Sequence, residues 1–255
     1  MRIEIDVSKT IEENAVSYYE KSKKAKRKIE GLRKAMLDTE RKISSLGIKK
    51  EISQQPKKSI KREKKWFEKF RWFYTSEGFL CIGGRDATTN DIIIKKYVSD
   101  DDLIFHTEAP GSPFFVIKCE GKTPGEKSSE EAAIATASFS KSWSQGFSTA
   151  EVYCVNPDQI KKELGLPKGS FMIYGKRKNF NVALKLAAGV YQEMPMCGPV
   201  ESVKANCDKF VLILQGNDSK SDVANKIRKY LNTYIELNDI ISVLPPGTCL
   251  MQSAK

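Results

Sequence analysis

The chain has 255 residues, of which 29% are charged, and it carries a formal net charge of +11 at pH 7. That length suffices for one large domain or two small ones, each with a buried core. No apolar run reaches the ~18 residues of a membrane span, and MRIEIDVSKT lacks the basic and apolar regions of a secretory signal, so we expect a cytoplasmic protein without a membrane segment.

The cysteines give no sign of a metal site. Six cysteines are scattered along the chain without a C-x-x-C pair, and the chain has one histidine. A structural zinc site needs clustered ligands, so we predict neither a metal nor a cofactor. We expect reduced thiols, several of them on apolar strands, rather than disulfides.

The positive charge is concentrated at the start of the chain. Residues 1–75 hold 22 of the 43 Lys and Arg residues but 11 of the 32 Asp and Glu residues, and therefore the whole net charge. A localised excess is expected of an arm that binds a polyanion. The alternative is that lysine serves here as a soluble helix former on a solvated face.

Residues 8–47 predict a long amphipathic helix. Thr10 and Glu13 have the spacing of a capping box at its start. Apolar and small side chains recur at alternating steps of four and three residues, the heptad pattern of a coiled coil. The pattern comprises Ile11, Ala15, Tyr18, Ser22, Ala25, Ile29, Leu32, Met36, Thr39, Ile43 and Leu46. Such a stripe needs a partner helix, within the chain or through self-association or another molecule.

A second, shorter helix is predicted after the break at Pro56. KKSIKREKKWFEKF places Ile60, Phe67 and Phe70 on one side. Because it is too short to cover the whole stripe, we expect a fragment whose missing N-terminal part supplied another helix. The alternative is a short antiparallel hairpin with a projecting tip.

The pattern then changes to mixed α+β. RWFYT and FLCIGG predict a β-hairpin, and DLIFH and FFVIK predict two further strands. Asp86 is expected to cap a short helix, and Ser129 a longer one that ends near Gly146. EVYCV and SFMIYG predict two more strands around a short PDQIKKEL helix. This order is not a regular βαβ alternation.

The end of the chain predicts a smaller α+β unit. VALKLAAGVYQ and KFVLILQG indicate strands, and CGPVESVKANC a short helix. DVANKIRKYLNTYI indicates a helix that buries Val223, Ile227, Leu231 and Tyr234. The predicted organisation is an arm over 1–70, a mixed α+β domain over 71–180 and a small α+β module over 181–255.

Two features invite a chemical interpretation. Gly83 to Asp86 precede a predicted helix, where backbone N–H groups can bind an anion and Arg85 a phosphate, although a plain strand-to-helix turn explains the same residues. His106 suggests acid/base chemistry with Asp86 or Ser112, but no nucleophile motif accompanies it. A lone histidine at a strand end is more typical of a structural or binding contact.

Basic residues interleaved with aromatic ones favour RNA. In KKSIKREKKWFEKFRWF we expect most rings in the core and the cations free to bind phosphates. These cations are Lys57, Lys58, Lys61, Arg62, Lys64 and Lys65. Lys176, Arg177 and Lys178 form a smaller cluster, for which a solvated loop is the alternative.

The same segments, taken in order, resemble the NFACT family. KKWFEKFRWFYTSEGFLCIGGRDATTNDIIIKKY resembles the opening of the NFACT RNA-binding domain, and DDLIFHTEAPGSPFFVIK its central strand pair. EEAAIATASFSKSW resembles its long helix, and VYCVNPDQIKK with GSFMIYGKRKNF its close, so the resemblance covers 62–180. The first helix is similar to the second half of the family's coiled coil. PMCGPVESVKANCDKFVLILQGNDSK and VLPPGT resemble its C-terminal module, and ATTND and EAPGSP are similar to the archaeal version.

The resemblance implies a role in ribosome quality control. Members of the family bind large ribosomal subunits obstructed by peptidyl-tRNA, recruit tRNA and support template-free extension of the stalled peptide. The expected partners are therefore the large ribosomal subunit, rRNA and tRNA, and the expected role is binding rather than catalysis. Because the family's N-terminal NFACT domain is absent here, we do not expect the full activity from this chain.

The resemblance also implies site residues. RNA or structural roles are expected for Arg85, Asp86, Asn90, Lys95, Lys96, His106, Glu108, Gly111, Lys118 and the cluster Lys176, Arg177, Lys178 and Asn179. Two other functions stay open: an RNA or peptidyl-tRNA hydrolase that uses His106, and a protein-interaction module that binds a partner helix through the heptad stripe.

Overall fold

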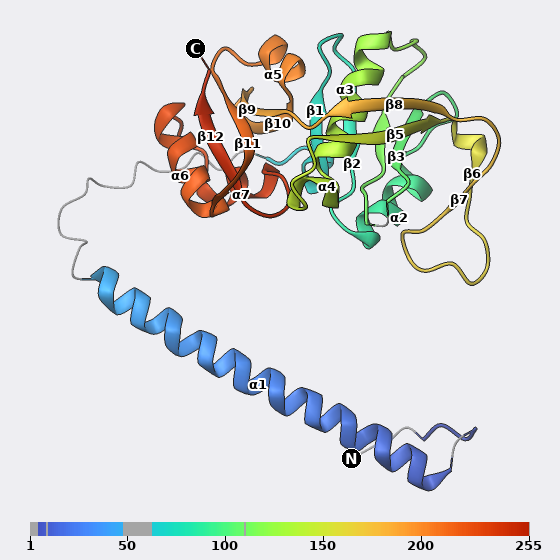
Figure 1. Ribbon diagram of the computed structural model, residues 1–255, viewed down its shortest axis with the longest axis vertical. Helices are drawn as coiled ribbons and strands as arrows, with labels where there is room; N and C mark the ends of the chain where they lie inside the picture. The colour runs from blue at the N-terminus through green and yellow to red at the C-terminus, as the bar shows by residue number, and fades with distance from the viewer. Residues whose placement is uncertain (1–4, 9, 48–62, 110, 255) are drawn as a thin grey trace. The chain divides into compact units, whose positions relative to one another are not determined.

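The computed structural model describes residues 5–8, 10–47, 63–109 and 111–254. The chain divides into two compact units, Met1–Lys57 and Lys58–Lys255. The second unit contains helices and antiparallel sheets, as predicted for an α+β protein (Figure 1). Among the described residues, no helix has the length and apolarity needed to cross a bilayer.

The described residues of the first unit form one long helix, α1 (Ile11–Gly47), and the turn before it. The predicted capping box is confirmed, since the Thr10 N–H donates to the Glu13 carboxylate at 2.9 Å and the Glu13 N–H donates to the Thr10 hydroxyl at 3.2 Å. Asn14 ties the preceding turn to the helix, because its side-chain amide exchanges two 3.0 Å hydrogen bonds with the backbone of Asp6. The helix start is therefore specified by local contacts.

The predicted apolar stripe lies exposed on α1 as far as Thr39, and the side chains of Ile43 and Leu46 lie outside the described residues. Ile11, Ile29, Leu32 and Met36 expose between 51% and 84% of their surface. An exposed stripe of this kind is what a coiled coil buries when it pairs. The partner helix stays a prediction.

The predicted helix over 57–70 is wrong where the structure describes it. Residues 57–62 lie outside the described residues, 63–65 are not helical, and a single 3₁₀ turn, η1 (Trp66–Lys69), follows. Lys65 is extended, and its N–H donates to the Glu68 carboxylate at 2.6 Å, which closes the turn. Phe67 and Phe70 are buried, as predicted, but in the core of the α+β unit.

Six antiparallel strands form the larger sheet. They are β1 (Arg71–Tyr74), β2 (Leu80–Gly83), β3 (Leu103–Thr107), β4 (Phe115–Ile117), β5 (Thr149–Val155) and β8 (Lys178–Ala183). The order β1-β2-β4-β3-β5-β8 contains the two predicted strand pairs as neighbours. The short helix α2 (Ala87–Lys96) follows β2, as predicted, and buries Ile93.

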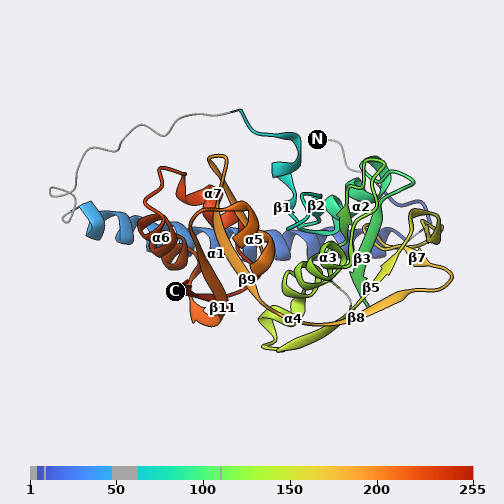
Figure 2. The same cartoon turned by 90° about the horizontal axis from the view of Figure 1, so that it is seen from above.

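A helix rich in small residues packs on this sheet. α3 (Glu126–Ser138) lies alongside β3 and β5 (Figure 2), and its alanines are fully buried because small side chains allow the backbone to approach the sheet closely. Ser129 is not its cap, contrary to the prediction. The helix starts earlier because the Glu77 carboxylate accepts from the N–H groups of Gly125 and Ser128, both at 3.1 Å. It ends at Ser138, and a separate turn, α4 (Lys141–Ser144), follows.

The predicted helix at 157–164 is also wrong. The chain forms a 3₁₀ turn, η2 (Pro157–Gln159), and a two-residue strand, β6 (Ile160–Lys161), which pairs with β7 (Met172–Ile173). Lys162 closes the loop between these strands, because its ammonium donates to the carbonyls of Pro167 at 2.6 Å and Ser170 at 2.9 Å. This loop reaches the candidate site described below.

A four-stranded sheet and three helices complete the chain. The sheet has the order β10-β9-β11-β12, with β9 (Leu186–Tyr191), β10 (Met194–Pro199), β11 (Phe210–Asp218) and β12 (Cys249–Ser253). The helices are α5 (Val200–Asn206), α6 (Lys220–Tyr230) and α7 (Leu237–Val243). One predicted strand, 182–192, is instead divided between β8 and β9, which belong to different sheets. In the predicted amphipathic helix, Val223 and Ile227 are buried, whereas Tyr234 lies beyond its end and is exposed.

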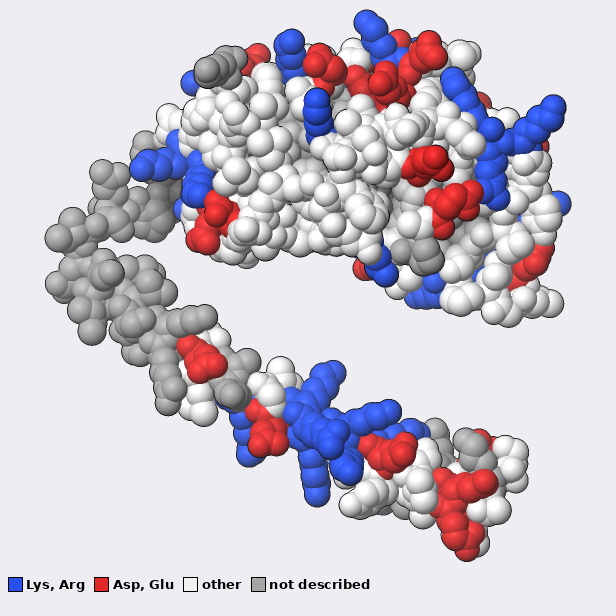
Figure 3. Space-filling model, in the orientation of Figure 1, with Lys and Arg blue, Asp and Glu red and all other residues white. Residues whose placement is uncertain are grey.

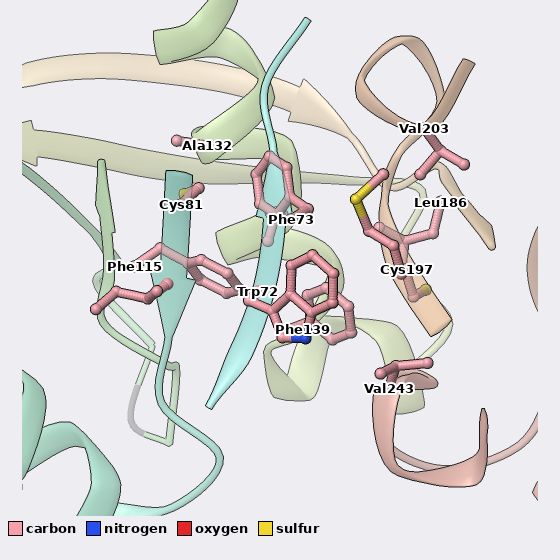
Figure 4. Packing of buried hydrophobic residues seen from close by; sticks show 14 of the residues in the cluster. Trp72, Phe73, Cys81, Phe115, Ala132, Phe139, Leu186, Cys197, Val203 and Val243 are labelled. Atoms are coloured by element: carbon pink, nitrogen blue, oxygen red, sulfur yellow. The ribbon is translucent and has the colours of Figure 1, made fainter. Parts of the chain in front are cut away.

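The core continues between the two sheets. Figure 4 shows Trp72 and Phe73 on β1, with Phe115 on one side and Leu186 toward the smaller sheet. A Cβ added at Gly198 would lie 2.9 Å from Cβ of Phe73, so a glycine on β10 allows this close approach. The six cysteines are free and buried, and burial raises the pKa of each thiol. That the thiols stay reduced remains a prediction.

Candidate nucleic-acid interface

A cleft of about 440 Å³ brings together several predicted residues. Its walls come from the β2–α2 turn, the end of β3, β5 and the loop that Lys162 closes. Six predicted residues line it: Arg85, Asp86, Asn90, His106, Glu108 and Gly111. Segments separated by more than 80 residues therefore form one depression, and the contacts of each side chain decide its role.

Asn90 builds the floor of the cleft. Its side-chain amide donates to the carbonyl of Ser112 at 3.3 Å and accepts from the N–H of Phe114 at 3.2 Å. A Cβ at Gly84 would lie 1.7 Å from Oδ1 of Asn90, so only glycine lets the helix approach this closely. Asn90 is thus buried and joins α2 to the segment of Ser112 and Phe114, which gives it a structural role.

Arg85 lines the cleft but directs its guanidinium to backbone carbonyls of the protein itself. Its guanidinium donates to the carbonyls of Ser242 at 3.0 Å, Glu68 at 3.2 Å and Phe70 at 2.9 Å. Burial lowers the pKa of this group. The planar fork therefore ties η1 to the end of α7, and a phosphate contact of Arg85 stays a prediction.

Asp86 occupies the start of α2. Its carboxylate accepts from the N–H of Thr89 at 2.8 Å and from the Thr89 hydroxyl at 3.0 Å, and the backbone hydrogen bond lowers the pKa of Asp86. The predicted cap is confirmed. An anion at this helix terminus would meet a carboxylate that already fills the position.

His106 is held as a neutral ring. Nε2 lies 3.2 Å from the carbonyl of Ser112, which can only accept, so Nε2 carries the proton. Nδ1 then accepts from the hydroxyl of Tyr153 at 3.2 Å, and the ring stacks on Phe114 with centroids 4.1 Å apart. Burial lowers the pKa of His106 to about 4. Its contacts are to a carbonyl, a phenol and a ring, not to Asp86 or to the Ser112 hydroxyl proposed as acid/base partners.

Two predicted clusters meet at the mouth of the cleft. Arg177 forms an ion pair with Glu108, and its guanidinium lies 4.6 Å from the ring centroid of Tyr153. Burial raises the pKa of Tyr153 to about 12, so the phenol stays protonated. Its hydroxyl can therefore donate to Nδ1 of His106. Lys176, Lys178 and Asn179 are exposed beside Arg177. Gly111 forms an exposed turn with φ of +84°.

The three remaining predicted lysines differ from one another. Lys118 is internal: its ammonium donates to the carbonyl of Tyr97 at 2.7 Å and forms an ion pair with the buried Asp102. Lys95 is exposed and pairs with Asp91 at 2.7 Å, one helical turn away. Lys96 is exposed in the last turn of α2. The α2 lysines are thus accessible to RNA, whereas Lys118 is structural.

The basic segment before β1 is only partly described. Lys57, Lys58, Lys61 and Arg62 lie outside the described residues. Lys64 forms an ion pair with Asp239 at 2.7 Å, and Lys65 donates to the side-chain carbonyl of Gln192 at 3.2 Å. Both are exposed above the smaller sheet and its helices.

The predicted site residues leave out several exposed cations of the first unit and two residues of the cleft. Six Lys and Arg residues lie within residues 21–28 of α1, all exposed, and Figure 3 shows basic side chains gathered over the middle of this helix. The run KSKKAKRK was a usable signal. Lys168 and Phe171 also line the cleft, because they lie in the loop that Lys162 closes, and no motif in the sequence marks them. Among the described residues, no group of His, Cys, Asp and Glu could hold a metal ion.

Comparisons with known proteins agree on one family. Residues 69–175 match the NFACT protein RNA binding domain. The chain is 40% identical over 212 residues to the archaeal Rqc2 homolog aRqcH of Methanocaldococcus jannaschii, an alignment that covers 79% of this chain and 31% of that protein. It is 34% identical over 197 residues to the ribosome quality control complex subunit NEMF homolog of Drosophila melanogaster, an alignment that covers 74% of this chain and 20% of that protein. It is 35% identical over 178 residues to the human ribosome quality control complex subunit NEMF, an alignment that covers 66% of this chain and 16% of that protein. The chain therefore spans about a third or less of the length of these relatives, and it belongs to the NFACT family, whose RNA-binding domain it contains.

Proposed function

We propose that this chain is the RNA- and ribosome-binding part of a cytoplasmic ribosome quality-control factor. The observation that carries the proposal is the match of residues 69–175 to an RNA-binding domain, within a chain 40% identical to an archaeal Rqc2 homologue. The concentration of the net positive charge in residues 1–75 supports it, because such a footprint suits a polyanion.

The proposed mechanism is binding without catalysis. Exposed cations at 21–28 of α1, in the basic segment before β1 and at the mouth of the cleft neutralise rRNA or tRNA phosphates. Arg85, Asn90 and Lys118 hold the domain together from within. The proposed partner is a large ribosomal subunit obstructed by peptidyl-tRNA, with tRNA recruited for template-free extension. Peptide-bond chemistry is then left to the ribosome.

The exposed stripe on α1 supports a second role, in which the arm binds a partner helix. Ile29→Asp would place a charge in the middle of the stripe and abolish pairing, whereas Lys→Glu changes in the run 21–28 would weaken RNA binding instead. Analytical ultracentrifugation of the two variants separates the two roles. Loss of RNA binding in Ile29→Asp, with pairing intact, would contradict this assignment.

Co-sedimentation tests the ribosome proposal. The chain is mixed with vacant large subunits and with subunits that carry peptidyl-tRNA, at low and at physiological salt. The proposal predicts salt-sensitive binding to both and tighter binding to the obstructed subunits. Absence of binding by the folded chain at low salt would refute a ribosome-binding role for this part of the protein.

A further inference from the structure

One of the three tryptophans is exposed. Trp72 and Trp143 expose 3% and 2% of their surface, whereas Trp66 exposes 47%. A single exposed apolar side chain needs no explanation by itself. Trp66, however, stands at the end of the basic segment, and its ring has a defined orientation.

Two other rings hold the indole in place. The ring of Tyr97 lies parallel to Trp66, with centroids 4.9 Å apart and an interplanar angle of 3°, and Phe67 meets it edge-on at 5.7 Å. Tyr97 is fixed in turn, because Phe70 packs against it edge-on at 5.3 Å. Tyr97 covers one face of the indole, and nearly half of the Trp66 side chain stays open to solvent.

One lysine contacts this ring pair, and two more are its neighbours in the sequence. Lys69 follows Trp66 by three residues in a 3₁₀ turn, where such positions are aligned, and its ammonium donates to the Tyr97 hydroxyl at 2.6 Å. Lys65 precedes Trp66 in the sequence, and its ammonium donates to Gln192 at 3.2 Å and lies 5.9 Å from the ring centroid of Phe67. Lys96 precedes Tyr97 in the last turn of α2 and is exposed. The acidic group within η1, Glu68, accepts from the Lys65 N–H at 2.6 Å. The surroundings are therefore basic, as a phosphate backbone requires.

We propose that Trp66 and Tyr97 form a stacking platform for one unpaired nucleobase of RNA, with Lys65, Lys69 and Lys96 beside the flanking phosphates. This inference rests on the proposed RNA-binding function and assigns it a specific site. Flat rings with adjacent cations bind single-stranded RNA with little sequence preference, because every base has a π-face. Neither Trp66 nor Tyr97 lines the cleft, so the platform is a second point of contact.

Tryptophan fluorescence tests the platform directly. Because Trp72 and Trp143 are buried, quenching of the exposed indole by RNA reports on Trp66. We expect single-stranded oligouridine and oligoadenosine to quench the emission, and a fully paired hairpin of equal charge to quench it less. Trp66→Leu should lower the affinity for the single strands by about 5- to 150-fold. Trp66→Phe, which keeps a flat ring, should keep most of it.

Matched variants separate stacking from charge and from folding. Phe147→Leu removes another exposed ring, 54% accessible, and should leave affinity unchanged. Lys96→Gln should reduce the salt dependence of binding, whereas Trp66→Leu should reduce affinity equally at all salt concentrations. Thermal unfolding of each variant shows that the domain is intact.

Three results would overturn the inference. If the wild type binds RNA with the expected salt dependence but Trp66→Leu binds equally well and the emission stays constant, the platform is refuted and the proposed function stands. If Trp66→Leu weakens binding to ribosomal subunits but not to RNA, the ring contacts protein instead. If the wild-type chain binds neither RNA nor subunits, the proposed function fails as well.

Discussion

Arg85→Met distinguishes a structural arginine from an RNA-binding one. The substitution keeps the apolar stem and removes a guanidinium that donates to the carbonyls of Glu68, Phe70 and Ser242. Hydrogen bonds from a charged donor contribute about 1.5–3 kcal/mol each, and unpaired buried carbonyls are unfavourable. Desolvation of the cation offsets part of this, so we expect a net loss of about 2–4 kcal/mol in the free energy of unfolding.

The assay is thermal and urea unfolding, followed by RNA titration of the folded variant. For a unit of this size, 1 kcal/mol lowers Tm by about 2–4 °C, so the expected decrease is about 4–16 °C. Arg177→Met is the matched control, because its exposed ion pair with Glu108 contributes about 0–1 kcal/mol. An Arg85→Met variant with wild-type stability and weakened RNA binding would refute the reasoning and restore the phosphate contact.

Three further predictions concern the interior. Burial lowers the pKa of His106 to about 4, so as the pH falls the unfolded chain binds a proton before the folded chain does, and stability is lost. Urea titrations should show that the difference in free energy of unfolding between wild type and His106→Gln shrinks by about 3 kcal/mol between pH 7 and 4. Lys118→Met leaves Asp102 buried without its cation and should cost about 3–5 kcal/mol, with RNA affinity unchanged in the folded fraction. Gly84→Ala forces a methyl group against Asn90 and should destabilise by about 3 kcal/mol, and an unchanged Tm would contradict the packing at the cleft floor.

Local signals explain what the sequence predicts well. The capping box at Thr10, the heptad stripe of α1 and the hairpin of β1 and β2 each depend on residues a few positions apart. The same holds for the cap at Asp86. Short-range hydrogen bonding and periodicity suffice for these elements.

Long-range contacts explain the errors. A lysine-rich segment favours a helix, but Phe67 and Phe70 are drawn into a core made by distant strands, and the chain forms only one 3₁₀ turn. α3 begins where the carboxylate of Glu77, about 50 residues earlier, caps it. No local pattern contains these partners.

The candidate site shows the same division. The sequence marks most of the residues that line the cleft, but not their roles. Arg85 becomes structural because Ser242, 157 residues later, supplies a carbonyl acceptor. Arg177 meets Glu108 and Tyr153 only because β5 and β8 pair beside β3. The sequence shows the type and position of each residue, but which residues contact one another becomes clear only from the fold.

The salt dependence of binding to large ribosomal subunits tests the central claim most directly. The slope of the logarithm of the binding constant against the logarithm of the salt concentration is measured for the wild type and for one triple variant, which combines Lys57→Glu, Lys58→Glu and Lys61→Glu. A control variant reverses three exposed lysines outside the arm, Lys204, Lys209 and Lys229. If the basic arm binds RNA, the first variant loses about 0.7–0.9 of slope per phosphate contact, roughly 2–3 in total, and the control keeps the wild-type slope. Equal slopes for all three proteins, or a loss confined to the control, would contradict an RNA-binding arm.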